Sequence, residues 1–144
     1  MKLGVIGLGV VGTANFKGFE LLGHEMFSHD IKFNTSIKDV LSTDIAFVCV
    51  PTPSFDNGSC DTTIVKSVVT ELNAHEYEGI IAIRADWTNA DEKITQALIK
   101  YGRIGIPLNV VLGPSLTEPI ILSEWLTKNE VLDAIKKAKN YSYQ

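Results

Sequence analysis

Three glycines near the amino terminus, Gly7, Gly9 and Gly12, stand at the spacing G-x-G-x-x-G. Between a strand and a helix, such glycines allow a tight turn, close approach of the backbone to a pyrophosphate, and close packing of helix on strand. Asp30 follows about where such a unit places a carboxylate that accepts hydrogen bonds from an adenosine ribose. These residues suit a dinucleotide, although the glycines alone also fit an ordinary turn and Asp30 alone a solvated one.

The elements around these residues favour the dinucleotide interpretation. Residues 2–6 form an apolar, β-prone run that leads directly into the glycines. Residues 11–22 then carry apolar side chains at helical spacing, and Gly23 is a helix stop signal. A second short strand at 25–28 precedes Asp30. Strand, glycines, helix, strand and acid therefore occur in the order that a dinucleotide-binding unit requires.

The rest of the chain continues to alternate strands and helices. Residues 44–50 form a continuous apolar run, which is typical of a parallel strand covered on both faces, and the prolines that follow end it. The pattern further predicts a short helix within 33–43 capped by Thr35 or Ser36, a loop at 54–61, a helix after Asp61 or Thr62, a strand at 79–84, a helix after Thr88 or Asn89, a fifth strand at 107–112, and closing helices at 120–126 and 131–138.

This alternation predicts an α/β fold, a Rossmann-type doubly wound parallel sheet of about five strands. All 144 residues are expected to form a single domain, 1–144, in which residues 115–144 supply the closing helices. Sheets of this type bind ligands beyond the carboxyl ends of their strands, here where the loops after the first and third strands meet.

Composition narrows the class of protein. Hydrophobic residues make up 45% and charged residues 21% of the chain, as in ordinary globular proteins, and the net charge of −4 favours neither nucleic acid nor an anionic membrane as a partner. No apolar run is long enough to span a bilayer, so a cytoplasmic location is expected. Cys49 and Cys60 suggest neither a disulfide nor a metal site, and the three histidines lack metal-ligand spacing.

Three segments of the chain resemble one family. Residues 2–12 resemble the opening K-x-x-V-I-G-x-G-x-V-G of the UDP-glucose/GDP-mannose dehydrogenases, in their amino-terminal NAD-binding domain. Gly23-His24-Glu25 with Asp30-Ile31 is similar to the family's G-H-x-V…D-I. Residues 47–53, F-V-C-V-P-T-P, and the following D-N-G-S-C-D closely resemble F-V-C-V-P-T-P…D-G-S-x-D, which is more specific than the glycine pattern. The resemblance covers about the first 75 residues well and is weak over 115–144.

The resemblance implies NAD as the cofactor. Backbone amides of residues 9–12 would hold the pyrophosphate, Asp30 the adenosine ribose, and residues 50–52 the nicotinamide side. Asp86 stands where the family has a threonine near the nicotinamide. Asp30 would repel the 2′-phosphate of NADP, an effect that Lys32 and His29 could soften. The implied cofactor-binding residues are Gly7, Leu8, Gly9, Val10, Val11, Gly12, Asp30, Ile31, Val50, Pro51, Thr52 and Asp86.

The chain departs from the family where chemistry is expected. Full-length members oxidise a sugar C6 alcohol twice through an aldehyde bound to a later cysteine, whereas no cysteine follows Cys60 here. No catalytic residue is therefore assigned, although Glu118 could match a family acid. By kinship the chain is an oxidoreductase, but complete activity by this chain alone is not expected, and a nucleotide-sugar substrate would need a partner chain.

Two alternatives stay open. The first is a non-catalytic Rossmann module that senses NAD or binds a partner, including a second copy of itself. The second is a small hydroxyacid-type dehydrogenase, which shares the glycine fingerprint but lacks V-P-T-P with D-G-S.

Overall fold

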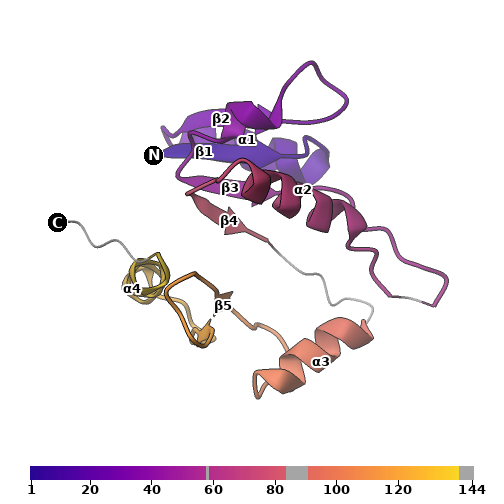
Figure 1. The fold of residues 1–144 in the computed structure, drawn as a ribbon, viewed down its shortest axis with the longest axis vertical. Helices are drawn as coiled ribbons and strands as arrows, with labels where there is room; N and C mark the ends of the chain where they lie inside the picture. The colour runs from indigo at the N-terminus through magenta and orange to yellow at the C-terminus, as the bar shows by residue number, and fades with distance from the viewer. Residues whose placement is uncertain (58, 84–90, 140–144) are drawn as a thin grey trace. The chain divides into compact units, whose positions relative to one another are not determined.

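The structure, a computed structural model, describes residues 1–57, 59–83 and 91–139. The chain divides into two compact units, Met1–Asp86 and Trp87–Gln144, each with its own strands and helices (Figure 1). Within the described residues, no helix combines the length and the apolar character needed to cross a membrane.

The first unit is built on a parallel sheet of four strands in the order β2-β1-β3-β4 (Figure 1). The two inner strands, the first and the third, each pair in parallel with a neighbour on both sides. In the first strand, for example, Leu3 lies opposite Met26 on one side and Ile45 on the other. This order places the first strand in the centre, and it brings the loops that follow three neighbouring strands to one edge of the sheet. The strands are β1 (Lys2–Ile6), β2 (Glu25–His29), β3 (Ile45–Val48) and β4 (Ile80–Ala82).

Helices connect these strands as the α/β pattern requires. α1 (Val10–Leu21) joins β1 to β2, the 3-10 helix η1 (Ile37–Val40) precedes β3, and α2 (Thr63–Ala74) joins β3 to β4. The predicted α/β class with a parallel sheet is thus confirmed, and the first four strands and the three connecting helices lie where the sequence predicted them.

The core of the first unit lies between the sheet and its connecting helices. Ile6, Val40 and Leu72 are almost completely buried, and they form one cluster with Ile37 and Ala46. The packing of η1 against the middle of β1 is close enough to limit which residue can stand there. A Cβ at Gly4 would run into the side chain of Val40, so glycine is what lets η1 lie directly against the strand.

The second unit contains short strands and two amphipathic helices. β5 pairs with β6 in antiparallel fashion, Val110 opposite Ile121 and Val111 opposite Ile120, and the pairing continues through a hydrogen bond from the Leu122 amide to the Asn109 carbonyl at 2.9 Å. Its elements are α3 (Glu92–Lys100), β5 (Val110–Val111), β6 (Ile120–Ile121) and α4 (Lys128–Ala138).

Two predictions for this region were wrong. The predicted fifth strand at 107–112 is shorter than expected and pairs with β6 instead of joining the parallel sheet, which has four strands among the described residues. The predicted helix at 120–126 is replaced by β6 and a turn. The β-branched pair Ile120-Ile121 directly after Pro119 favours an extended strand over a helix, and three apolar residues are too few to reveal a helical period.

The closing helix α4 has a side-chain brace at its start. The Thr127 hydroxyl accepts a hydrogen bond from the Glu130 amide at 3.2 Å, as an N-cap residue does. The Glu130 carboxylate in turn accepts from the Ser123 amide and hydroxyl, both at 2.6 Å. These bonds tie the turn after β6 to the helix, whose predicted span of 131–138 is confirmed and extended by one turn.

Candidate functional site

The turn after β1 requires glycine at two of its three positions. Gly7 has a φ of +92°, and a Cβ there would lie 2.6 Å from the Cys49 carbonyl oxygen. Gly12 is buried, and its Cβ would overlap the carbonyl oxygen of Gly7. The first glycine therefore lets the turn pass close to the end of β3, and the last lets α1 pack against the turn.

Gly9 has a different role, because nothing lies within 4 Å of the position that its Cβ would take. It is the N-cap residue of α1, with extended backbone, no side-chain cap and no acidic residue in the first helical turn. Val10 is 91% and Val11 67% exposed. The first amides of a helix have no intrahelical acceptor and carry the positive end of the helix dipole, so this open end can bind an anion such as a pyrophosphate.

Asp30 directly follows β2 and connects to the glycine turn. Its Oδ2 accepts a hydrogen bond from the Leu8 amide at 2.6 Å, and its Oδ1 accepts from the Lys32 amide at 2.8 Å. These two bonds, first the one from Lys32 and then the one from Leu8, hold the pKa of Asp30 below its usual value. The carboxylate is thus ionised at neutral pH and is fixed beside the turn that carries the open helix end.

The loop after β3 passes along the same turn. The Cys49 amide donates to the Ile6 carbonyl at 2.7 Å, and the Cys49 thiol receives a hydrogen bond from the Asn15 side chain of α1 at 3.6 Å. Val50 packs against the core, whereas Pro51 and Thr52 are exposed.

Beyond Thr52 the loop closes on itself. The Asp61 amide donates to the Pro53 carbonyl at 2.7 Å, the Phe55 amide to the Ser59 carbonyl at 2.8 Å, and the Cys60 thiol to the Thr52 carbonyl at 3.7 Å. This small hairpin anchors the segment that carries Pro51 and Thr52 before α2 begins.

The structure brings together most of the residues that the sequence singled out. Leu8 contacts Asp30, and Gly7 lies against Cys49, so the loops after β1, β2 and β3 meet at one edge of the sheet. Ile31 is 92% exposed beside Asp30. Asp86 lies outside the described residues. Sequence reasoning missed Cys49 and Asn15 as part of this arrangement, although the position of Cys49 at the end of an apolar strand was a usable signal.

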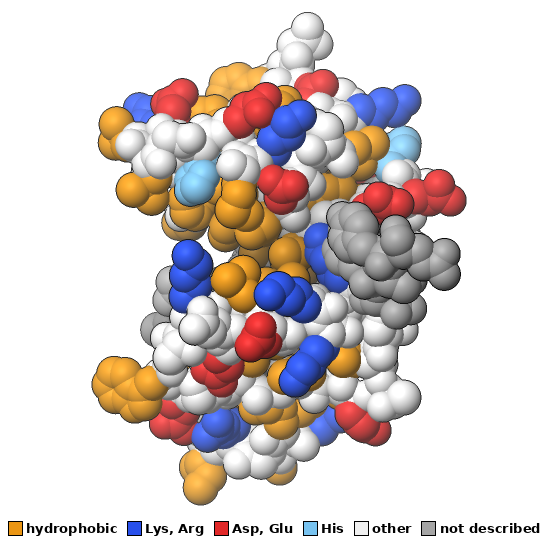
Figure 2. All heavy atoms as spheres, turned by 90° about the vertical axis from the view of Figure 1, so that its left-hand side faces the viewer, with side chains coloured by type: hydrophobic (Ala, Val, Ile, Leu, Met, Phe, Trp, Pro, Cys, Tyr) orange, Lys and Arg blue, Asp and Glu red, His pale blue; other side chains and the backbone are white. Residues whose placement is uncertain are grey.

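The residues that the structure describes also include potential metal ligands and two cysteines. The described residues contain no group of three His, Cys, Asp or Glu side chains that could hold a metal ion. Cys49 and Cys60 are free thiols. Figure 2 shows acidic and basic side chains interspersed on the face that it draws, in keeping with the net charge of −4.

Comparison with known proteins decides the family. The model of the UDP-glucose/GDP-mannose dehydrogenase family, NAD binding domain, matches residues 20–140, which is most of the chain. The chain belongs to this family. As the NAD-binding domain of a UDP-glucose/GDP-mannose dehydrogenase family member, it has NAD as its cofactor and is an oxidoreductase by kinship. The match begins at residue 20, after the glycine turn.

The comparisons with solved structures and with curated proteins gave one weak match. A solved ternary complex of GDP-mannose dehydrogenase from Pseudomonas aeruginosa is similar at 25% identity with a TM-score of 0.45, covering 50% of this chain and 24% of that chain. No curated protein matches. The matched half of this chain thus covers about a quarter of the length of that dehydrogenase.

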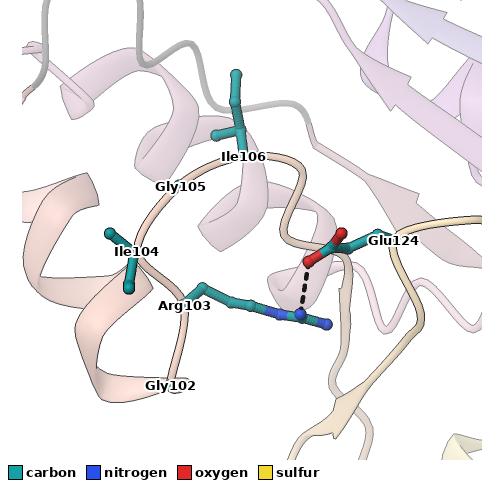
Figure 3. A pocket seen from close by; sticks show the side chains of 6 residues that line it. All are labelled: Gly102, Arg103, Ile104, Gly105, Ile106 and Glu124. Atoms are coloured by element: carbon teal, nitrogen blue, oxygen red, sulfur yellow. Dashed lines mark hydrogen bonds and ion pairs between the residues drawn. The ribbon is translucent and has the colours of Figure 1, made fainter.

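The second unit contains a cavity of its own. It measures about 320 Å³ and is lined by residues 102–106 and Glu124. Figure 3 shows Arg103 and Glu124 reaching toward one another, and their ion pair is 2.7 Å long. Both side chains are partly exposed, and the ion pair connects the turn after α3 to the turn after β6. We interpret this ion pair as a structural contact within the second unit.

Proposed function

We propose that this chain binds NAD at the loops after β1, β2 and β3. The amides of residues 9–12 hold the pyrophosphate, Asp30 accepts hydrogen bonds from the adenosine ribose, and residues 50–52 lie along the nicotinamide side. The observation that carries this proposal is the 2.6 Å hydrogen bond from the Leu8 amide to Asp30, which fixes the ribose acceptor beside the open end of α1. The full set of proposed contacts comprises Gly7, Leu8, Gly9, Val10, Val11, Gly12, Asp30, Ile31, Val50, Pro51, Thr52 and Asp86.

The residues present suit the cofactor in shape and charge. The space beside Gly9 is open, and a side chain at this position would occupy it. The exposed first turn of α1 has no carboxylate that would compete with a phosphate. Each carboxylate oxygen of Asp30 accepts one backbone hydrogen bond, which leaves lone pairs for two ribose hydroxyls.

The ionised state of Asp30 supports NAD over NADP. A carboxylate whose pKa is lowered keeps its negative charge at neutral pH, and it would repel a 2′-phosphate. The nearby Lys32 could offset part of this repulsion, so a reduced affinity for NADP is expected instead of complete exclusion.

The chemistry proposed for this site is limited to holding the cofactor. Bound NAD supplies a hydride acceptor, and the protein orients it. We propose that oxidation of a nucleotide-sugar needs groups outside these 144 residues. A partner chain, either another protein or a second copy of this one, would supply them. NADH formation from UDP-glucose or GDP-mannose by this chain alone would contradict that part of the proposal. Assignment of residues 1–144 to one NAD-binding domain is supported by a family match that spans both units.

Calorimetric titration with NAD and with NADP tests the cofactor site. The parent chain should bind NAD more tightly than NADP. Asp30→Ala should weaken NAD binding by about tenfold or more, since a hydrogen bond to an ionised acceptor is lost. Gly9→Val should abolish detectable binding, because its side chain would occupy the phosphate position.

The matched control is Gly18→Val, which makes the same change inside α1, at another position where nothing lies within 4 Å of the Cβ. It should leave NAD affinity unchanged. Absence of heat at millimolar NAD with the folded parent chain would overturn the proposed function.

A further inference from the structure

The hydroxyl of Thr35 is bonded to both backbone groups of Asp30. Thr35 Oγ1 accepts a hydrogen bond from the Asp30 amide at 3.0 Å and donates to the Asp30 carbonyl at 3.2 Å. The Nδ1 atom of His29 lies 3.3 Å from the same oxygen. The Thr35 side chain is partly buried, so these bonds form with limited competition from water.

These bonds act where the sheet stops supporting the backbone. The His29 carbonyl still accepts from the Gly7 amide at 2.8 Å, but the Asp30 amide lies beyond the last paired residue of β2. β2 is an edge strand of the sheet, and Thr35 supplies an acceptor for the Asp30 amide that follows it. The Asp30 carbonyl also accepts a hydrogen bond from the Phe33 amide at 3.0 Å, which closes a turn between Asp30 and Phe33.

Fixing this backbone fixes the direction of the carboxylate. Asp30 reaches the Leu8 amide with one oxygen and the Lys32 amide with the other, and both bonds require its Cα to stay in place. A chain of hydrogen bonds thus runs from Thr35 through Asp30 to the glycine turn.

We propose that Thr35 is a positioning residue of the adenosine ribose site, which orients the Asp30 carboxylate toward the ribose hydroxyls through its own bonds to the Asp30 backbone. The proposal rests on the NAD site proposed above and deepens it. Thr35 is bonded to the backbone of Asp30 and not to its carboxylate. Its effect should therefore appear in discrimination at the ribose, more than in the overall ability to bind a phosphate.

The test compares NAD with an analogue that lacks the 2′-hydroxyl of the adenosine ribose, titrated into the full chain. The parent should prefer NAD by about tenfold or more. Thr35→Val removes the hydroxyl at nearly constant shape, and this preference should fall by about threefold or more because the acceptor is no longer held in place. Thr35→Ser keeps the hydroxyl and should restore the preference.

Thr43→Val is the matched structural control. The Thr43 hydroxyl is buried and donates to the Val40 carbonyl at 2.7 Å, away from Asp30, so its loss should lower stability and leave ribose discrimination unchanged. If Thr35→Val does not fold, Thr35→Ala, which introduces no larger group, is read in the same way.

Each outcome separates this inference from the function beneath it. An unchanged preference in Thr35→Val, or an equal fall in Thr43→Val, overturns the role of Thr35 while NAD binding stands. A parent chain that binds NAD and its 2′-deoxy analogue equally also overturns it. A parent chain that binds neither overturns the proposed function and this inference together.

Discussion

At the scale of residues, backbone geometry dictates glycine more strictly at Gly7 than at Gly9. The positive φ of Gly7 and its approach to the Cys49 carbonyl leave no room for a side chain whether or not a ligand is present. Nothing lies within 4 Å of the Cβ position of Gly9, so the packing of the chain does not require glycine there. Under the proposed function, the requirement at Gly7 is one of folding and that at Gly9 is one of binding.

Gly7→Ala should destabilise the chain by about 1–3 kcal/mol, because it combines a strained φ with a contact that the backbone must move to relieve. Urea unfolding followed by circular dichroism measures the change. Gly18→Ala is the control, since it removes a flexible residue from the interior of α1 and should stabilise the chain by up to about 1 kcal/mol. A Gly7→Ala variant as stable as the parent would mean that the turn differs from the one described.

The sequence was sufficient to predict that the glycine turn, Asp30 and the loop after the third strand meet at one edge of the sheet, but not how these residues bond. The spacing of the glycines and the place of Asp30 after the second strand follow from the order of elements. The hydrogen bonds from Leu8 and Thr35 to Asp30 depend on how two loops of several residues are placed, which no local pattern encodes. Thr35 was predicted as a possible helix cap, whereas Ser36 caps η1 with Asp39 and leaves Thr35 to bond with Asp30.

At the scale of elements, long periodic segments were predictable and short apolar runs were not. α1 and α2 each extend over 12 residues and lie where the pattern placed them. β5 and β6 have two residues each, which is too few to show a period. Their pairing with each other depends on tertiary structure and not on the local sequence. Asp91, whose side chain accepts from the Lys93 and Ile94 amides, caps α3, while the predicted caps Thr88 and Asn89 lie outside the described residues.

The brace at the start of α4 makes a prediction about acid. Its bonds from Ser123 hold the pKa of Glu130 below the usual 4.5. Because the folded-state pKa is depressed, the unfolded state binds more protons as the pH falls below about 4.5, so the stabilisation is complete above that pH and is lost in acid. Glu130→Gln should therefore be less stable than the parent at pH 7, and the difference should shrink as the pH falls.

Urea unfolding of parent and variant from pH 7 to pH 3 measures this effect. Ser123→Ala, which removes the hydroxyl donor, should show a smaller difference with the same pH dependence. A difference between Glu130→Gln and the parent that stays constant over this range would show that the carboxylate does not support the helix through its charge.

At the scale of the whole molecule, family membership and the described fold agree on a cofactor-binding role. The family match spans residues 20–140, and the glycine turn that precedes it has the spacing of a dinucleotide-binding turn. The sheet of four parallel strands is enough to place three loops around one site. A cytoplasmic location and association with a partner or a second copy stay predictions.

On the proposed function, NAD binds at the edge formed by the loops after β1, β2 and β3. The most direct measurement is an amide ¹H–¹⁵N correlation spectrum of the labelled chain during titration with NAD. We predict that the largest shifts fall on the amides of residues 8–12 and on those around Asp30, with smaller changes near Thr52. Saturable NAD binding that leaves the amides of residues 8–12 unmoved would contradict the account.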